Sequence, residues 1–479
     1  MKRGFDVIIV GGGPGGLAAG ALLAREGVSV AIVEKAPAVG GRYRSIEFHG
    51  CRVDSGIHFI VSLYGTPEKC YAFRLFKDLG LPLDYKAVPW AMCLVSKERP
   101  GEVEYFAMDS KLGPANFFEF FAFATGVRME ESAKDELLRV ASITADMSEE
   151  ECRKIVDVTF ADWIDNNIKD PVAAAVLYGM EPIVGAPVKQ MNFGMVASAF
   201  GTFNTSGAPM PWYPKTGTLE DAIITPLAQC FTKHGGEIIT HRTVRSITIE
   251  NGEIKGVVAQ NSQNNYMLEE FSAPVVISAI PIFEAVTRNI LRREFLTEEW
   301  LESIKRCEAI SEHDLSGFYL LRKKFLTDQP YDWVHVFDVD YGLPTYVGDW
   351  GLASHTNATE PKDKQLVCSY ISGSGEAAYF GLTAPMEMVW KANRMFLEGM
   401  EKGYPGFIEA IEHEGLNVQL SHGRYAYATV PAEIDIQSPN IQGLYFTGDS
   451  VRSVGSAASD KVFQLAYPVC ERVLEYVRG

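Results

Sequence analysis

The sequence predicts an α/β fold that begins with a parallel sheet, because its first segment alternates between strand and helix patterns. Residues 7–10 are four apolar residues without a polar interruption, which is typical of a strand buried on both faces. A glycine-rich turn follows at residues 11–16, and an Ala- and Leu-rich helix over 17–25 ends at Gly27. Residues 28–33 repeat the strand pattern. Strand, turn, helix and strand form a unit whose two strands run parallel.

The glycine turn has the spacing Gly-x-Gly-x-x-Gly, and an acid closes the second strand. Gly11 permits the tight turn, Gly13 lets a diphosphate approach the backbone, and Gly16 lets the helix lie close to the strand. Free N–H groups at the helix start then face the diphosphate, and Glu34 is placed to accept hydrogen bonds from a ribose. We therefore predict a dinucleotide site, with a purely structural turn as the alternative. The same unit supplies three further predicted contacts: Pro14, Gly15 and Lys35.

A second glycine pair, Gly40-Gly41, and Arg42 follow six residues after the acid. Together with the stretch Gly50 to His58, they resemble the FAD proteins of the amine oxidase and phytoene desaturase superfamily. In those proteins the chain turns back over the diphosphate at this point and the arginine neutralises it. The resemblance implies FAD as the cofactor, with Gly41, Arg42, Gly56, Ile57 and His58 among its contacts. A surface salt bridge is the alternative for Arg42.

The stretch from Tyr213 to Thr218, followed by a predicted helix over 219–233, resembles the "Y-P-x-G-G-M" turn of phytoene-desaturase-like proteins. It departs from that pattern at Thr216 and Thr218. The resemblance implies that the backbone of Val244, on a later strand, meets the adenine of FAD. It favours the carotenoid-desaturase and retinol-saturase-like branch of the superfamily.

Near the end of the chain a predicted strand is again followed by a glycine and an acid, Gly448 and Asp449. The resemblance implies that Asp449 bonds the ribityl hydroxyls. It also implies that the segment before the last helix faces the flavin through three small residues: Ser456, Ala457 and Ala458. Three positions depart from the small residues that relatives mostly carry here: Asp460, Lys461 and Phe463.

The resemblance implies a two-domain fold of the amine-oxidase and GDI type. Residues 1–62, 211–283 and 426–479 are expected to form a Rossmann-like FAD-binding domain, a parallel sheet with helices. Residues 63–210 and 284–425 are expected to form an α+β substrate domain, with the flavin ring at the junction.

His58 is the first candidate for a catalytic group, because an imidazole titrates near neutral pH; a structural histidine is the alternative. Lys215 is a weaker candidate. Tyr425 and Tyr427 share one face of a predicted strand, and in relatives aromatic residues there line the cavity over the flavin; ordinary core tyrosines are the alternative. Amine oxidases often keep a lysine near flavin N5, and the pattern places Ser316 there instead.

These features predict an FAD-dependent oxidoreductase that transfers a hydride between a C–C bond of a lipophilic or cyclic small molecule and flavin N5. Two alternatives stay open: a flavin amine oxidase, and a non-redox protein such as a flavin-dependent isomerase or a GDI-like binding protein. No second nucleotide-binding pattern accompanies the first, so we expect a separate, unidentified electron donor or acceptor.

Composition excludes some partners. The formal charge of −17 argues against nucleic acid. No apolar run is long enough to span a membrane, although peripheral membrane contact stays open. The eight cysteines show neither a Cys-x-x-Cys pair nor metal-ligand spacing. With no signal peptide expected, we predict reduced thiols, a cytoplasmic location and no metal site; the sequence does not indicate an oligomeric state.

Overall fold

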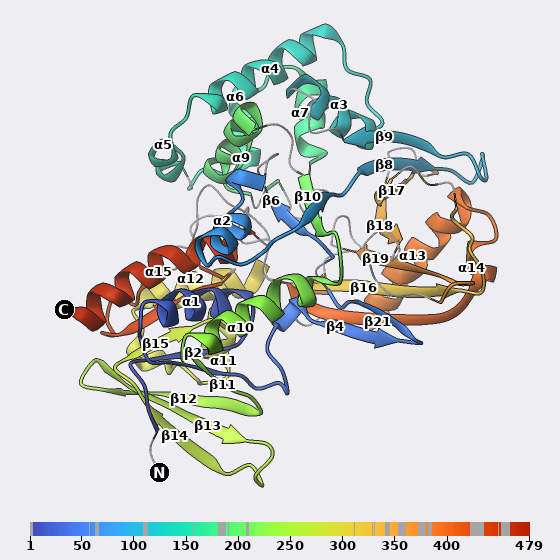
Figure 1. The fold of residues 1–479 in the computed structure, drawn as a ribbon. Coiled ribbons are helices and arrows are strands. Elements are labelled where there is room, and N and C mark those ends of the chain that lie inside the picture. The colour runs from blue at the N-terminus through green and yellow to red at the C-terminus, as the bar shows by residue number, and fades with distance from the viewer. Residues whose placement is uncertain are drawn as a thin grey trace.

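The computed structural model describes residues 3–56, 58–62, 67–108, 114–155, 157–180, 188–189, 191–206, 210–310, 312–327, 329, 331–340, 345–352, 361–371, 380–381, 386–421, 435–448, 450–451 and 460–479. Figure 1 shows the course of the chain, with the two termini at the same end of the molecule.

A five-stranded parallel sheet forms one end of the molecule, which confirms the predicted α/β class. Its strand order is β11-β3-β2-β15-β22. Every side chain of the central strands is buried, as expected for a parallel sheet covered on both faces. The strands are β2 (Val7–Val10), β3 (Val30–Val33), β11 (Glu237–Ile239), β15 (Val275–Ser278) and β22 (Leu444–Phe446).

Helices pack beside this sheet: α1 (Pro14–Arg25), α10 (Thr225–Lys233) and α15 (Lys461–Arg478). The first helix begins three residues earlier than predicted, because proline is well tolerated at a helix start. The helix predicted over 219–233 begins instead as a π-helical turn, Glu220–Ile224. Pro226 lies in the first turn of α10 and has no N–H to donate, so the α-helical hydrogen bonding cannot continue unbroken through it.

A second, four-stranded sheet lies beside the first in the order β1-β14-β13-β12. The hairpin between its two long strands turns at Asn251 and Gly252, both with positive φ (53° and 78°), as the Asn-Gly signal predicts. The strands are β1 (Arg3–Gly4), β12 (Arg242–Glu250), β13 (Glu253–Asn261) and β14 (Leu268–Ser272).

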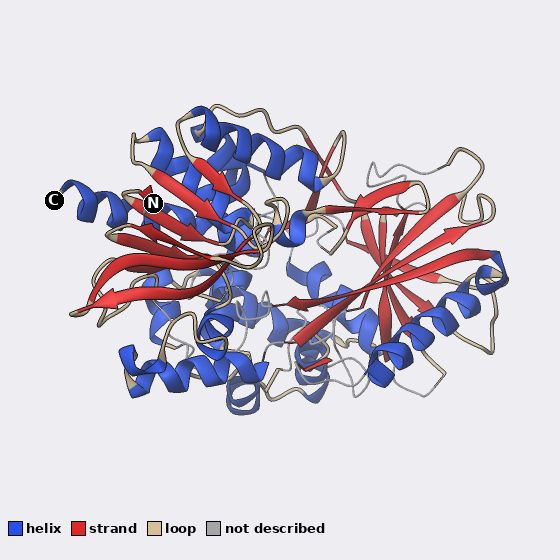
Figure 2. Cartoon of the chain, turned by 90° about the horizontal axis from the view of Figure 1, so that it is seen from below, coloured by secondary structure: helices blue, strands red, loops and turns tan. Residues whose placement is uncertain are grey.

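An eight-stranded mixed sheet forms the other end, in the order β20-β16-β19-β18-β17-β8-β9, with β21 paired to β16. Figure 2 shows it fanned out opposite the parallel sheet, with the long helix α13 (Met386–Gly403) against it. The strands are β8 (Trp90–Val95), β9 (Glu104–Met108), β16 (Glu312–Leu321), β17 (Trp333–Asp338), β18 (Thr345–Leu352), β19 (Gln365–Ile371), β20 (Phe380–Gly381) and β21 (Ile411–Ser421).

A group of helices covers the region between the two ends (Figure 1). It holds α3 (Pro114–Thr125), α4 (Glu131–Ala145), α5 (Glu149–Lys154), α6 (Phe160–Asn167), α7 (Pro171–Tyr178) and α9 (Phe193–Ser206). Four of the clustered phenylalanines in α3 are buried, with less than a tenth of each side chain exposed: Phe117, Phe118, Phe120 and Phe121. The remaining helices are α2 (Tyr71–Asp78), α11 (Ile282–Thr287), α12 (Glu298–Ile310) and α14 (Phe407–Ala410).

Two small elements join the ends. The hairpin of β4 (Ser45–Phe48) and β5 (Cys51–Asp54) follows the second glycine pair. In a three-stranded sheet, β10 (Met210–Pro214) pairs on one side with β6 (Ile60–Ser62) and on the other with β7 (Tyr85–Ala87). Segments far apart in the sequence therefore meet where the two ends of the molecule adjoin. The predicted domain boundaries stay a prediction.

Candidate cofactor site at the glycine turn

The glycine turn after β2 has the geometry that each of its glycines was predicted to permit. Gly11 has a φ of 103°, which L side chains rarely adopt. A Cβ on Gly16 would lie 2.2 Å from the Gly11 carbonyl oxygen, so only glycine lets α1 pack this close to the strand. Beside Gly13, in contrast, no atom of the described residues lies within 4 Å of where a Cβ would be. The start of α1 thus faces open space, as a diphosphate site requires.

Glu34 lies at the turn, although it follows the next strand. Its side chain is 8% exposed. One carboxylate oxygen accepts the Gly12 N–H at 2.7 Å and the other accepts the Ala36 N–H at 2.8 Å. The carboxylate therefore fixes the turn and stays beside the place predicted for the ribose. Lys35 is exposed to solvent.

The second glycine pair folds back onto the first. The Gly40 N–H donates to the Gly12 carbonyl oxygen at 2.7 Å. A Cβ on Gly41 would lie 3.3 Å from the Gly13 Cα. The chain thus passes directly over the turn, and Arg42 continues this segment as a partly buried side chain.

The closing strand reaches the same turn from the other end of the sequence. The N and Cα atoms of Gly448 each lie 3.5 Å from where a Cβ of Gly15 would be. Nearby, at the carboxyl ends of β15 and β22, the hydroxyl groups of Ser278 and Thr447 are buried and find no hydrogen-bond partner among the described residues. Ligands of open α/β sheets bind at this edge. Four predicted contacts of this segment lie outside the described residues: Asp449, Ser456, Ala457 and Ala458.

Asp54 and Tyr213 form a buried contact between the stretch Gly50 to His58 and the Tyr-Pro turn. The Tyr213 hydroxyl donates to one Asp54 oxygen, and the Leu219 N–H donates to the other at 3.0 Å. Asp54 therefore holds the start of the helix that follows the Tyr-Pro turn. Burial raises the pKa of this carboxyl from 3.8 to about 7, against the opposing effect of both hydrogen bonds. Both residues lie in stretches that carry the family resemblance, but the sequence pattern does not predict this contact.

The hairpin of β4 and β5 is held to the same helix start by further polar contacts. The Ser45 N–H donates to Glu220 at 2.8 Å, and Arg52 pairs with Asp221. Asp221 also accepts the Thr218 N–H at 3.0 Å. The hairpin is thus fixed against the π-helical turn that leads into α10.

His58 lies at the junction, and its neighbours come from the mixed sheet. Its side chain is 6% exposed. Its ring centroid lies 5.4 Å from that of Trp333 and 6.5 Å from those of Phe318 and Tyr370. Ser316 is paired directly with Tyr370 across the strands, and its buried hydroxyl has no hydrogen-bond partner within the described ranges. His58 is therefore enclosed by an aromatic wall rather than by solvent.

The other candidates are placed less centrally. Lys215 forms an ion pair with Asp84 at 2.7 Å, and its side chain is 54% exposed. Val244 is buried on β12. This strand starts beside Glu34, because the Arg242 N–H donates to the Glu34 carbonyl oxygen at 2.9 Å. Gly56 is buried ahead of His58. Three candidates lie outside the described part of the chain: Ile57, Tyr425 and Tyr427.

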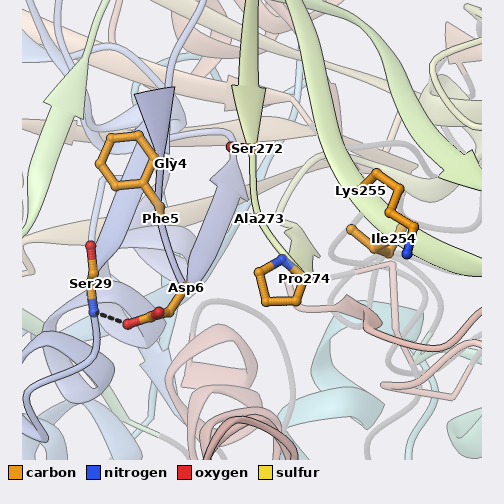
Figure 3. A pocket seen from close by; sticks show the side chains of 9 residues that line it. All are labelled: Gly4, Phe5, Asp6, Ser29, Ile254, Lys255, Ser272, Ala273 and Pro274. Atoms are coloured by element: carbon orange, nitrogen blue, oxygen red, sulfur yellow. Dashed lines mark hydrogen bonds between the residues drawn. The ribbon is translucent and has the colours of Figure 1, made fainter. Parts of the chain in front are cut away.

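An open hollow of about 410 Å³ lies elsewhere (Figure 3). Its lining includes Asp6, Ser29 and Pro274, which directly precede β2, β3 and β15. It is therefore at the amino ends of the strands, at the opposite edge from the glycine turn. The Asp6 carboxylate is already bound to the Ser29 N–H at 2.9 Å.

Comparison with known proteins agrees with this geometry. The family described as an NAD(P)-binding Rossmann-like domain matches residues 9–79. A 4,4'-diapophytoene desaturase of Methylomonas is 25% identical over 54% of this chain and 52% of its own. An all-trans-retinol 13,14-reductase of Rattus norvegicus is 25% identical over 58% of this chain and 48% of its own. The chain thus spans about half the length of these curated relatives.

Solved structures match along the whole chain. An oxidoreductase from Methanosarcina mazei has a TM-score of 0.67 at 16% identity, covering 97% of this chain and 99% of its own. Cyclohexylamine oxidase from Brevibacterium oxydans has a TM-score of 0.63 at 15% identity, covering 99% and 100%. The chain therefore shares the fold of these structures along its whole length. A Rab GDI from Plasmodium falciparum, with a TM-score of 0.53 at 10% identity over 100% of this chain and 98% of its own, shares this two-domain fold.

Proposed function

We propose that this chain is a member of the amine oxidase and phytoene desaturase superfamily and an FAD-dependent oxidoreductase that transfers a hydride between a C–C bond of a lipophilic or cyclic small molecule and the flavin. The observation that carries the proposal is the meeting of three separate segments at one glycine turn. Among the described residues, none fills the space beside Gly13. Gly41 packs against the Gly13 Cα, and Gly448 packs against Gly15 from the other end of the chain. Two strand-end hydroxyls there are buried with no hydrogen-bond partner in the part of the chain that the structure describes, and a ligand would satisfy them.

FAD fits this arrangement better than a nicotinamide dinucleotide does. A nicotinamide site needs the turn, the helix start and the acid, all of which Gly13, α1 and Glu34 supply. It does not need a second glycine pair folded back over the first, nor a closing strand delivered to Gly15. The two extra segments would contact a cofactor from both ends of the chain. This supports FAD, because the resemblance places the flavin against the closing segment.

The chain's own groups have distinct tasks in this proposal. The N–H groups at the start of α1 bind the diphosphate, and Glu34 accepts from the ribose. FAD, when bound, supplies the hydride acceptor or donor at flavin N5. The enclosed imidazole of His58 holds or moves a proton at one of its ring nitrogens. The surrounding rings of Phe318, Trp333 and Tyr370 exclude water from that position.

The aromatic wall supports an apolar substrate. In the described part of the chain, the sheet face around His58 carries three aromatic rings and the Ser316 hydroxyl, without a charged side chain among those contacts. The two curated relatives are named for reactions on diapophytoene and all-trans-retinol. No described helix combines the length and apolar character needed to cross a membrane.

The substrate class is tested by anaerobic mixing of the flavin-loaded protein with polyenes or enoyl compounds and, separately, with amines. We expect a polyene or enoyl compound to remove the absorbance of the oxidised flavin, or to restore it in the reduced protein. Bleaching by amines alone would establish C–N oxidation instead. A flavin that responds to neither class would contradict both forms of the proposal.

His58→Ala is expected to slow flavin reduction or reoxidation by substrate at least about 100-fold, because general acid–base groups contribute on that order. FAD should stay bound, because the N–H groups at the start of α1 and the Glu34 carboxylate, which are proposed to hold it, are unchanged. Stopped-flow absorbance measures the rate, and His49→Ala, which changes an exposed histidine in the turn between β4 and β5, is the control. An unchanged rate in His58→Ala would remove the imidazole from the mechanism.

A further inference from the structure

The hydroxyl group of Ser316 is a buried polar group that finds no hydrogen-bond partner among the residues that the structure describes. Ser316 lies on β16 and is 1% exposed. A buried hydroxyl that makes no hydrogen bond has lost its contacts with water and gained nothing in exchange, so it lowers stability. Such groups are rare in folded proteins. A ligand that brings a hydrogen-bonding atom to this hydroxyl would remove the cost.

The register of the mixed sheet shows which way this side chain points. Residues directly opposite each other on neighbouring antiparallel strands place their side chains on the same face. Ser316 is opposite Tyr370 on β19 and opposite Asn417 on β21. Phe318, two residues further along β16, shares this face. The ring centroids of Phe318 and Tyr370 each lie 6.5 Å from that of His58, so Ser316 is on the face that His58 covers.

The segment that leads to His58 contacts the sheet on both sides of Ser316. The Asn417 side-chain amide donates to the Ser55 carbonyl oxygen at 2.6 Å, which holds the segment at one neighbour of Ser316. His58 lies beside the other neighbour, Tyr370. The Ser316 hydroxyl is therefore at the junction of the two ends of the molecule, where the flavin ring is expected.

The opposite face of the same sheet satisfies its polar groups within the protein. Ser369, which is paired with Gly317, accepts the Gly317 N–H at 3.1 Å, and its hydroxyl lies 3.3 Å from that of Tyr319. The Tyr319 hydroxyl also donates to the side-chain oxygen of Asn393 on α13 at 2.5 Å. Because strand residues alternate between faces, these contacts lie on the α13 side, opposite Ser316. A structural serine and an unpartnered serine thus lie on the two faces of one sheet.

We propose that the Ser316 hydroxyl binds an oxygen atom of the substrate, so that the protein prefers an alcohol or carbonyl derivative of a lipophilic molecule over the corresponding hydrocarbon. This inference rests on the proposed function, because it takes the junction around His58 as the substrate site. The rings of Phe318, Trp333 and Tyr370 accommodate the apolar part of such a molecule, and the hydroxyl recognises its polar end. A hydrocarbon would leave the hydroxyl buried and unpaired.

The test compares the affinities of the flavin-loaded protein for matched ligands. The probes are all-trans-retinol, all-trans-retinal and the hydrocarbon in which a hydrogen atom replaces the retinol hydroxyl group; farnesol and its hydrocarbon form a shorter pair. The change in the flavin absorption spectrum on titration gives each Kd. We expect the wild-type chain to bind an oxygen-bearing ligand about tenfold or more tightly than its hydrocarbon, as one buried hydrogen bond does. Ser316→Ala should reduce this preference to within about threefold.

Two controls separate substrate recognition from a structural role. Ser369→Ala changes the buried serine on the opposite face, so it should lower the midpoint of thermal unfolding and keep the wild-type preference. Ser316→Ala should not lower that midpoint, because the hydroxyl that it removes has no partner within the described ranges. If the alanine variant does not fold, Ser316→Cys, whose thiol is a weak hydrogen-bonding group, carries the same expectation and is read in its place.

A wild-type preference that persists in Ser316→Ala would overturn the inference. Equal weakening of the oxygen-bearing and hydrocarbon ligands in that variant would also overturn it, because the hydroxyl would then act on the flavin or on a bound water. Equal affinity of the wild-type chain for both kinds of ligand would overturn it and leave the proposed function intact. If neither the long nor the short ligands bind or react, the proposed substrate class itself is contradicted.

Discussion

At the scale of single residues, the site is organised by buried carboxylates that hold backbone N–H groups. Glu34 accepts from Gly12 and Ala36, Asp54 accepts from Leu219, and Asp460 accepts from Tyr71 and Ala72. Each carboxylate thereby fixes a turn or a helix start that belongs to a different stretch of the chain. These acids thus fix the backbone segments that surround the candidate site.

Asp54 makes stability depend on pH in a definite direction. Its pKa is about 7 in the folded chain and about 3.8 when unpaired, so the folded state holds a proton that the unfolded state releases between these values. The stabilisation is therefore present at low pH and is lost as pH rises through 7. Between pH 4.5 and 7 the loss is on the order of 3 kcal/mol in the free energy of unfolding.

We expect Asp54→Asn to remove this slope, because the amide keeps an acceptor for the Leu219 N–H and does not titrate. Urea unfolding of wild type and variant at pH 4.5 and pH 7 measures the difference. Parallel changes with pH in both proteins would show that Asp54 does not titrate in this range.

At the scale of elements, the strand, glycine turn and helix at the start of the chain could be predicted almost completely from sequence. Their signals are local: an apolar run, glycine spacing and a terminal acid. The cap of α2 could not be predicted, because its acceptor, Asp460, is almost 390 residues away from the helix that it caps. The contact between Asp54 and Tyr213 depends in the same way on tertiary packing that periodicity does not encode.

Two glycines of the turn give a matched pair of variants. A Cβ at Gly16 would overlap the Gly11 carbonyl oxygen, whereas a Cβ at Gly13 meets open space and the residue has an ordinary φ of −72°. Gly16→Ala should therefore lower the stability of the flavin-free protein by about 1–3 kcal/mol, as overpacking does.

Gly13→Ala should leave that stability nearly unchanged and weaken FAD binding about tenfold or more, because the methyl group occupies the approach of the diphosphate. Thermal unfolding without flavin and FAD titration separate the two effects. Normal FAD affinity in Gly13→Ala would show that no diphosphate lies over this glycine.

At the scale of the whole molecule, the site exists only when distant parts of the chain are assembled. β2 and β22 lie in one sheet although almost the full sequence separates them. The Asn417 side-chain amide, on the mixed sheet, donates to the Ser55 carbonyl oxygen at 2.6 Å. Ser55 directly follows β5, so this bond links the mixed sheet to the hairpin of β4 and β5. Family resemblance could predict which segments meet, but not the residues that join them, such as Asn417, since these contacts depend on the relative placement of both ends.

If these assembled segments form an FAD site, titration of the flavin-free chain with FAD should reveal it. We predict saturable binding of one FAD per chain, with the absorption bands of a protein-bound flavin, and no displacement by NAD. A chain that retains no flavin, or that binds NAD at the glycine turn in its place, would contradict it.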